Sequence, residues 1–306
     1  MKKLILLLLP LLFLTGCTDR TELGDRAIIE AAAVDYTDGK YRVSALLFSS
    51  GGGAGSTIDA SQENVIKVTG EGKTAAEAFD SISLIDGKEI YLSEMKLLVL
   101  GDGFSHISTA PLLNTLFYDM RCSLNMPVCC AEKAEMLTDL RFSEGITSAE
   151  KPLDMMKNAS REGVSPDTTL LDLLCGIESK KPVLIPMFAE TENGYGMTSD
   201  ESGRTAELVG TRPLQNALLG GVNSPEETVA IMLLTGDSDR IKLNFFYGGS
   251  EQTCEAYRIK AELVPSLEES SVRVTARFRG RNSAKLSPEM EQRALEALAE
   301  LVAQAL

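Results

Sequence analysis

The sequence predicts an α+β fold, in which mixed β-sheets carry packed helices. Helical and strand-like patterns alternate through the first part of the chain, whereas the last part is rich in strand patterns and ends in a helix. The first two strand patterns, residues 27–36 and 40–48, flank an Asp-Gly turn and predict an antiparallel hairpin. An initial hairpin favours a mixed sheet over a doubly wound parallel one.

The first part predicts an α/β-like domain. Residues 51–55 (GGGAG) predict a flexible loop within residues 49–61. Thr74 is a candidate N-cap with Glu77 three residues later, which predicts that a helix begins there. Further strands are expected at residues 64–69, 95–100 and 127–130, and a short extended segment at 182–188. Helices are expected at residues 74–84, 108–120, 131–140, 148–160 and 168–177.

The second part predicts a strand-rich domain. The polar, glycine-rich segment at residues 191–204 is interpreted as a linker or a long hairpin loop. The strand at 271–279 alternates apolar residues with arginine and threonine. Ser287 and Pro288 then open a helix as N-cap and first helical residue. Strands are expected at residues 205–210, 230–235, 241–247, 254–263 and 271–279.

The first residues predict export. Lys2 and Lys3 precede a short apolar run, residues 4–14, and small residues follow it. A transmembrane helix needs about 20 apolar residues, so this run predicts a cleaved signal and no permanent span. The expected organisation is a signal peptide at 1–16, a lipidated tether at 17–26, an N-terminal domain at 27–192, a linker at 193–204 and a C-terminal domain at 205–306.

Cys17 is the one functional residue that the sequence singles out. Residues 14–17 (LTGC) resemble the lipobox of bacterial lipoproteins, where a diacylglycerol is attached to the cysteine thiol after cleavage. One acyl chain binds a membrane only marginally, whereas two or three on one residue form a stable anchor. The alternative is an ordinary signal peptide with Cys17 in a disulfide. We expect lipidation and a place on the outer face of a membrane.

Charge restricts the partners. The formal net charge is −14, and loss of Lys2 and Lys3 with the signal leaves −16. Nucleic acid is therefore not an expected partner, because phosphate binding needs concentrated positive charge. Attraction to an anionic membrane surface is disfavoured for the same reason, so the lipid has to supply the anchor.

The other cysteines form no recognisable site. Their number is odd, and they show no CxxC pair and no repeated spacing, so neither zinc nor a disulfide framework is supported. Buried thiols are expected, and one non-local disulfide remains open. These cysteines are Cys122, Cys129, Cys130, Cys175 and Cys254.

No catalytic, cofactor or metal site is predicted. The single histidine, His106, is expected to be a surface or capping residue. Glu226 and Glu227 fit the first turn of a helix, where the helix dipole favours acidic side chains, and residues 268–269 (Glu-Glu) fit a turn.

Two further motifs have structural interpretations. Residues 70–74 (GEGKT) lack the spacing of a phosphate-binding loop and predict a strand-to-helix turn. Arg273, Arg277, Arg279 and Arg281 form a positive stripe. A solvated strand face is the first interpretation of the stripe, and a docking surface for acidic headgroups or an acidic partner loop is the alternative.

The order of motifs resembles the Ger(x)C spore germination lipoproteins, the C subunits of nutrient germinant receptors. The resemblance rests on Cys17, residues 19–23 (DRTEL), residues 69–74 (TGEGKT) and residues 90–101 (IYLSEMKLLVLG), with weaker similarity afterwards. Thr18 stands where the family commonly has tryptophan. Family members usually continue past the final helix, so the C-terminal domain is expected to be short relative to the family.

The resemblance implies a non-enzymatic subunit in the spore inner membrane. It implies assembly with two integral membrane subunits into a nutrient receptor, with covalent lipid on Cys17 and no other cofactor. Whether this subunit contacts the nutrient is left open. A solute-binding lipoprotein of a transporter is the alternative, although the unlike halves of the chain disfavour two similar lobes around a cleft. A lipid-anchored hydrolase is disfavoured by the scarcity of histidine.

Overall fold

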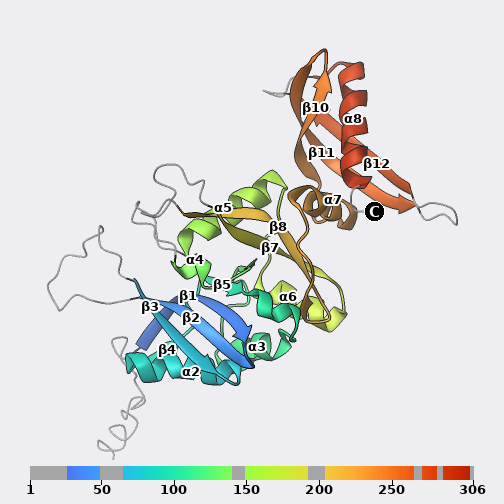
Figure 1. The fold of residues 1–306 in the computed structure, drawn as a ribbon. Coiled ribbons are helices and arrows are strands. Elements are labelled where there is room, and N and C mark those ends of the chain that lie inside the picture. Colours follow the sequence, from blue (N-terminus) through green and yellow to red (C-terminus); the bar gives the residue numbers. More distant parts are fainter. Residues whose placement is uncertain are drawn as a thin grey trace, which may run out of the picture.

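The computed structural model has an α+β fold, as predicted, with two separate sheets (Figure 1). It describes residues 26–48, 65–139, 149–191, 204–264, 271–280 and 285–303. A nine-stranded mixed sheet and a three-stranded antiparallel sheet organise these residues. The predicted signal and tether, Cys17 included, lie outside them, as do the glycine-rich loop at 51–55, residues 268–269 and Arg281.

The predicted hairpin is confirmed. Strands β1 (Arg26–Thr37) and β2 (Lys40–Phe48) pair antiparallel, and β3 (Val65–Gly72) pairs antiparallel with β2. The turn holds Asp38 at φ 54° and Gly39 at φ 79°. Positive φ at both central residues matches the right-handed twist of the flanking strands, and Asp-Gly is a favoured pair for it.

The large sheet is parallel in the middle and antiparallel at its ends. Its order is β3-β2-β1-β5-β6-β7-β8-β9, and β4 pairs in parallel with the start of β1. Parallel pairing joins β1 to β5, β5 to β6 and β6 to β7. The remaining strands of this sheet are β4 (Glu89–Tyr91), β5 (Leu97–Leu100), β6 (Val128–Ala131), β7 (Val183–Thr191), β8 (Thr205–Gln215) and β9 (Leu218–Leu219).

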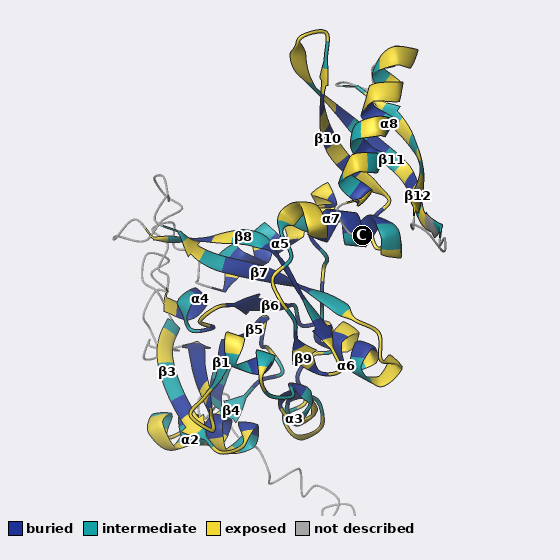
Figure 2. Ribbon diagram, turned by 45° about the vertical axis from the view of Figure 1, so that its right-hand side comes forward, coloured by how far each residue is buried: buried dark blue, intermediate teal, exposed yellow. Residues whose placement is uncertain are grey.

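Helices cover both faces of this sheet, so its central strands are buried throughout (Figure 2). Successive residues of a strand point to opposite faces. In β5, Leu98 and Leu100 join one core cluster, whereas Leu97 and Val99 join the other. The first cluster includes residues of α2 (Ala75–Asp86), α3 (Ala110–Asn114) and α6 (Leu170–Ser179), and the second includes residues of α4 (Met136–Asp139) and α5 (Glu150–Glu162).

The turn between β3 and α2 is the strand-to-helix turn that the sequence predicts. Thr74 caps α2, its hydroxyl accepting from the Glu77 N–H, and the Glu77 carboxylate accepts from the Lys73 N–H. The glycines allow α2 to approach the strand closely. A Cβ on Gly70 would lie 2.3 Å from the Ala78 carbonyl oxygen, and one on Gly72 would lie 2.4 Å from the Ala78 nitrogen.

The domain boundary predicted at residues 193–204 needs correction. Strand β8, which follows it, pairs antiparallel with β7 along the same sheet. The buried Arg212 side chain on β8 also donates to Asp102, and Thr109 donates to the Ala217 carbonyl oxygen. Residues 205–219 therefore belong to the first structural unit, and the second sheet begins only at β10 (Arg240–Tyr247).

The strand predicted at residues 230–235 is wrong, because these residues are the second half of helix α7 (Pro225–Thr235). The helix is covered on two sides. Thr228 hydrogen-bonds Thr211 of β8, whereas Val229 and Leu233 pack in the core of the second sheet. A helix buried on two sides shows no single apolar stripe, so its short apolar run resembles a strand.

The second sheet has the expected strands and one covered face. Strands β10, β11 (Ser250–Val264) and β12 (Ser271–Arg279) are antiparallel, and α8 (Pro288–Ala303) packs on them. The predicted alternation of β12 is confirmed. Val274, Ala276 and Phe278 pack toward α8, while the side chains between them are exposed.

Candidate functional site

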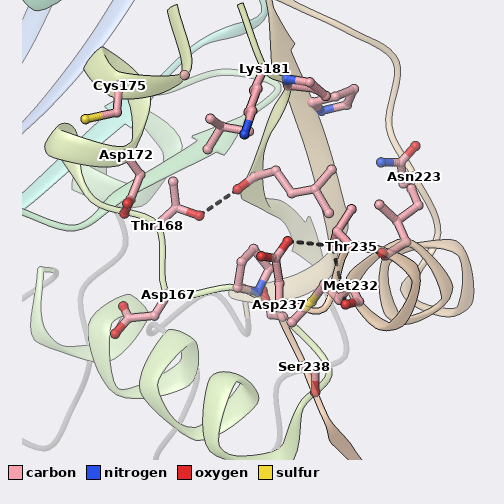
Figure 3. A pocket seen from close by; sticks show the side chains of 18 of the residues that line it. Asp167, Thr168, Asp172, Cys175, Lys181, Asn223, Met232, Thr235, Asp237 and Ser238 are labelled. Carbon is pink, nitrogen blue, oxygen red and sulfur yellow. Dashed lines mark hydrogen bonds between the residues drawn. The ribbon is translucent and has the colours of Figure 1, made fainter. Parts of the chain in front are cut away.

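A cavity of about 700 Å³ lies where the large sheet meets helix α7 (Figure 3). One wall comes from residues 165–168, helix α6 and the start of β7, and the other from Pro213, Asn223 and α7 with the residues that follow it. Small-molecule sites usually measure roughly 300–1,000 Å³. The cavity is therefore the candidate site, at the seam between the two sheets.

Internal hydrogen bonds fix the α6 wall. The Thr168 hydroxyl donates to the Leu184 carbonyl oxygen at 2.6 Å. Thr169 and Asp172 form a capping box at the start of α6, in which the Asp172 carboxylate accepts from the Thr169 N–H at 2.9 Å. Cys175 lies one turn further along α6 and is exposed. Threonine and aspartate three residues apart are what this helix start requires.

The α7 wall is fixed in the same way. The Thr235 hydroxyl donates to Asp237 at 2.6 Å, and the Ser238 hydroxyl donates to the Arg240 carbonyl oxygen at 2.9 Å (Figure 3 shows the Thr235 contact). The Asn223 backbone exchanges two hydrogen bonds with Thr211 of β8. Both walls are thus positioned without a ligand.

The lining is acidic and leaves one buried hydroxyl without a protein partner. Asp167, Asp172 and Asp237 line the cavity against a single cation, Lys181. Ser165 is 1% exposed, and its Oγ finds no hydrogen-bond partner among the described residues. A buried hydroxyl without a partner is costly. A small polar solute, or water, could supply the partner.

A second polar cluster lies at the carboxyl ends of the parallel strands. The Arg212 guanidinium donates to the Gly220 carbonyl oxygen at 2.8 Å, to Asp102 at 2.7 Å and to the Ser105 hydroxyl at 2.7 Å. The hydrogen bond from Arg212 lowers the pKa of Asp102. These contacts tie β8 to the 3-10 turn η3 (Asp102–Ser105), which follows β5.

Asp35, near the end of β1, belongs to the same edge of the sheet. Burial raises the pKa of this carboxyl to about 6, and the N–H of Ala134, which donates to it at 2.9 Å, lowers the pKa in part. Gly101 makes room for this carboxylate, because a Cβ on it would meet Asp35 directly. Asp35 and Asp102 each lie at the end of a buried apolar run, a sequence signal that could have indicated them.

The polar residues that the sequence interpreted as structural have structural roles, and Cys17, the one predicted site residue, lies outside the described residues. His106 closes η3 through its backbone N–H, as a capping residue. Ser224 and Glu227 form the capping box of α7. On β12, Arg279 donates twice to Glu255 and lies 5.4 Å from the Tyr257 ring centroid. The arginines of the positive stripe that the structure describes, Arg273, Arg277 and Arg279, lie on an exposed strand face. This agrees with the first interpretation of the stripe, a solvated strand face.

The cysteine prediction is mostly right. Cys122, Cys129, Cys130 and Cys254 are buried free thiols, whereas Cys175 is exposed. Burial raises the pKa of Cys122 and of Cys130 to about 12, so both stay protonated and unreactive.

Among the described residues, no group of three or more histidine, cysteine, aspartate and glutamate side chains is arranged to hold a metal ion. None of the helices described is both long and apolar enough to cross a bilayer.

Comparison with known proteins defines the class. Residues 19–190 match the family described as "Spore germination protein N-terminal domain". The match spans more than half of the chain, so the chain belongs to this family of spore germination proteins. The resemblance inferred from the sequence is therefore confirmed.

The chain is also similar to two known proteins. It is 29% identical over 120 residues to the putative spore germination protein YfkR of Bacillus subtilis (strain 168), a match over 37% of this chain and 31% of that protein. The crystal structure of the GerBC protein aligns with a TM-score of 0.48 at 16% identity, over 90% of this chain and 80% of that one.

Proposed function

We propose that the chain is a membrane-anchored lipoprotein subunit of a spore nutrient germinant receptor. It acts in germination by assembling with two integral membrane subunits, and it is not an enzyme. The observation that carries the proposal is the family match over residues 19–190, which begins two residues after the proposed lipidated cysteine, Cys17. Membership of a spore germination family and a lipobox at that position support the same role.

The proposed location is the outer face of the spore inner membrane. The diacylglycerol on Cys17 holds the chain there, and the polar residues 18–25 separate the lipid from the first strand. Several acyl chains on one residue give the stable anchoring that a single chain does not. The net charge of −14 gives no electrostatic attraction to an anionic surface, so anchoring depends on the lipid.

Co-purification tests the assembly. The chain is captured from detergent-solubilised spore membranes, and the proteins that follow it are identified by mass spectrometry. Two multi-span membrane proteins in near-equal amounts are expected, with a lower yield from Cys17→Ala. Exposed Cys175, changed to alanine, is the matched control and should leave the yield unchanged. Recovery of a transporter permease and ATPase would instead support the solute-binding alternative.

Contact with a small polar solute is a second candidate function. The cavity volume, the acidic lining and the partnerless hydroxyl of Ser165 favour it. An amine or amino acid suits the excess of carboxylates. Calorimetric titration with a panel of amino acids and sugars tests the idea. Asp167→Asn should weaken binding of a cationic solute, whereas Asp80→Asn on the exposed side of α2 should not.

A further inference from the structure

The start of β1 and the end of α2 lie together at one end of the large sheet. Arg26 of β1 pairs with Glu89 of β4, which lies three residues after Asp86, the last residue of α2. The last turn of α2 and the first described residue of the chain therefore lie at the same end of the molecule (Figure 1).

The last turn of α2 presents two aliphatic side chains to solvent. Leu84 is 87% exposed and Ile85 is 63% exposed, whereas the other large apolar residues of the helix, Phe79 and Ile82, are buried. Tyr91 of β4 lies beside the start of β1, with the Arg26 guanidinium 4.8 Å from its ring centroid. We name Leu84, Ile85 and Tyr91 the α2 edge.

The charges near the α2 edge nearly cancel. Arg26 and Lys88 are positive, whereas Asp86, Glu89 and Asp80, one turn before Leu84, are negative. The edge is therefore close to neutral on a strongly acidic protein. Helices that lie on a membrane bury apolar side chains at the headgroup boundary, and tyrosine is enriched at membrane–water interfaces.

We propose that the α2 edge rests on the bilayer that carries the lipid anchor, with Leu84 and Ile85 inserted at the headgroup boundary. The inference rests on the proposed lipidation of Cys17. That cysteine precedes Arg26 by nine residues, and such a segment spans at most about 30 Å. The anchor therefore holds this end near the membrane, and tethering makes insertion of even two side chains effective.

The proposal also orients the rest of the molecule. The second sheet lies at the far end from α2 in both views (Figures 1 and 2). Phe246, 71% exposed on β10 near the hairpin tip, is there. The exposed face of β12, with Arg273 and Arg277, is at that end too, away from the headgroups.

Single tryptophan probes test the α2 edge. The chain has no tryptophan, so one introduced residue reports its own surroundings without background. The variants Leu84→Trp, Ile85→Trp and Phe246→Trp are made in the full-length chain, lipidated in cells and reconstituted in phosphatidylcholine vesicles. Tryptophan at positions 84 and 85 should emit at shorter wavelength than in protein without vesicles and be quenched by bromine-labelled acyl chains. Tryptophan at position 246, the matched exposed position, should show neither change.

A second measurement uses removal of the aliphatic groups. The double variant Leu84→Ser/Ile85→Ser should raise, on the order of tenfold, the rate at which the anchored chain transfers between vesicles, whereas Phe246→Ser should not. Tenfold corresponds to about 1.4 kcal/mol. Thermal unfolding should be unchanged in all these variants, because the substituted side chains are exposed.

Four outcomes overturn the inference on the edge or its orientation, and they are distinguishable. Anchored protein in which the probes of Leu84→Trp and Ile85→Trp stay in water rejects the α2 edge and leaves the lipid anchor standing. Equal quenching at position 246 rejects a defined orientation. A mature mass without lipid on Cys17 rejects the anchor and the inference together. A fourth result, probes that respond only after the two integral subunits are added, would mean that the edge binds protein and that the membrane proposal is wrong.

Discussion

The two sheets of this protein are buried in different ways. The nine-stranded sheet has core clusters on both faces, and its central strands β5 and β6 are buried at every position. The three-stranded sheet packs α8 on one face, and the other face of β12 is exposed. Substitutions on either face of the nine-stranded sheet should therefore destabilise the fold. The three-stranded sheet instead leaves one face available for contacts with other molecules.

The largest expected effect tests whether both faces of the large sheet contribute to stability. Phe79 of α2 and Phe188 of β7 belong to opposite clusters, and both are fully buried. Each change to alanine should lower the free energy of unfolding by about 3–5 kcal/mol, because each leaves a cavity. Denaturant unfolding measures this loss.

The control substitution for Phe79→Ala and Phe188→Ala lies on the exposed face of the second sheet. Arg277→Ala should alter the free energy of unfolding by less than about 0.5 kcal/mol, as is usual at exposed positions. A loss comparable to that of Phe188→Ala would mean that this face is covered, and the contrast between the sheets would fail.

The next prediction concerns Arg212, whose contacts place β8 in the first structural unit. Arg212→Ala removes two hydrogen bonds from β8 to η3 and one to the Gly220 carbonyl oxygen, and it leaves Asp102 without its cation. A loss of about 2–3 kcal/mol is expected, since hydrogen bonds to charged groups contribute more than neutral ones. Arg293→Ala on α8, an exposed arginine with a neighbouring glutamate, should stay within about 0.5 kcal/mol. Equal losses would contradict the role of Arg212.

Asp35 gives the large sheet a pH dependence opposite in sign to that of the second sheet, where hydrogen bonds lower the pKa of Glu255 and of Glu296. Burial raises its pKa to about 6, above the roughly 3.9 of an unfolded chain. The folded state therefore binds the Asp35 proton more tightly than the unfolded chain does. The contribution of protonated Asp35 to the stability of the fold is fully present below about pH 4 and is lost as the pH rises through 6.

Asp35→Asn should remove that loss. The variant should be more stable than the parent at pH 7 by about 1–2 kcal/mol, and the two should converge near pH 4. Thermal unfolding across pH 4–8 measures it. Asp38→Asn, in the exposed turn where asparagine also accepts positive φ, should follow the parent curve. A parent that gains stability relative to Asp35→Asn between pH 4 and pH 7 would contradict the sign.

The smallest effect concerns α7, which joins the two regions. Ser224→Ala removes the hydroxyl that accepts from the Glu227 N–H and should cost about 1 kcal/mol. Ser224→Asp retains an N-cap acceptor and should cost little. If both variants lose the same stability, the capping box does not hold this helix.

The same difference in burial decides what the sequence could predict. Residues 271–279 alternate because one face is exposed, and residues 97–100 are continuously apolar because both faces are covered. Local signals such as Asp38-Gly39 and Thr74-Glu77 predicted their turn and cap correctly. Helix α7 was mistaken in part for a strand, because Met232 and Leu233 bury different sides of it.

The site depended on contacts that no local pattern contains. Arg212 and Asp102 are 110 residues apart, and their pairing required the sheet order. The cavity likewise combines α6, β7 and α7. Placing β8 in the second domain separated these segments in the prediction, so neither the cavity nor the pairing of Arg212 with Asp102 could be anticipated.

The central claim, a lipid-anchored subunit acting in nutrient-triggered germination, is tested most directly by complementation. Spores that lack this chain are supplied with the parent, with Cys17→Ala or with the control Asp80→Asn, which is exposed on α2 and outside the cavity, and germination is followed by loss of optical density. The parent and Asp80→Asn should restore the response to the nutrient, and Cys17→Ala should leave it strongly reduced. Full restoration by Cys17→Ala at equal protein level would contradict the account.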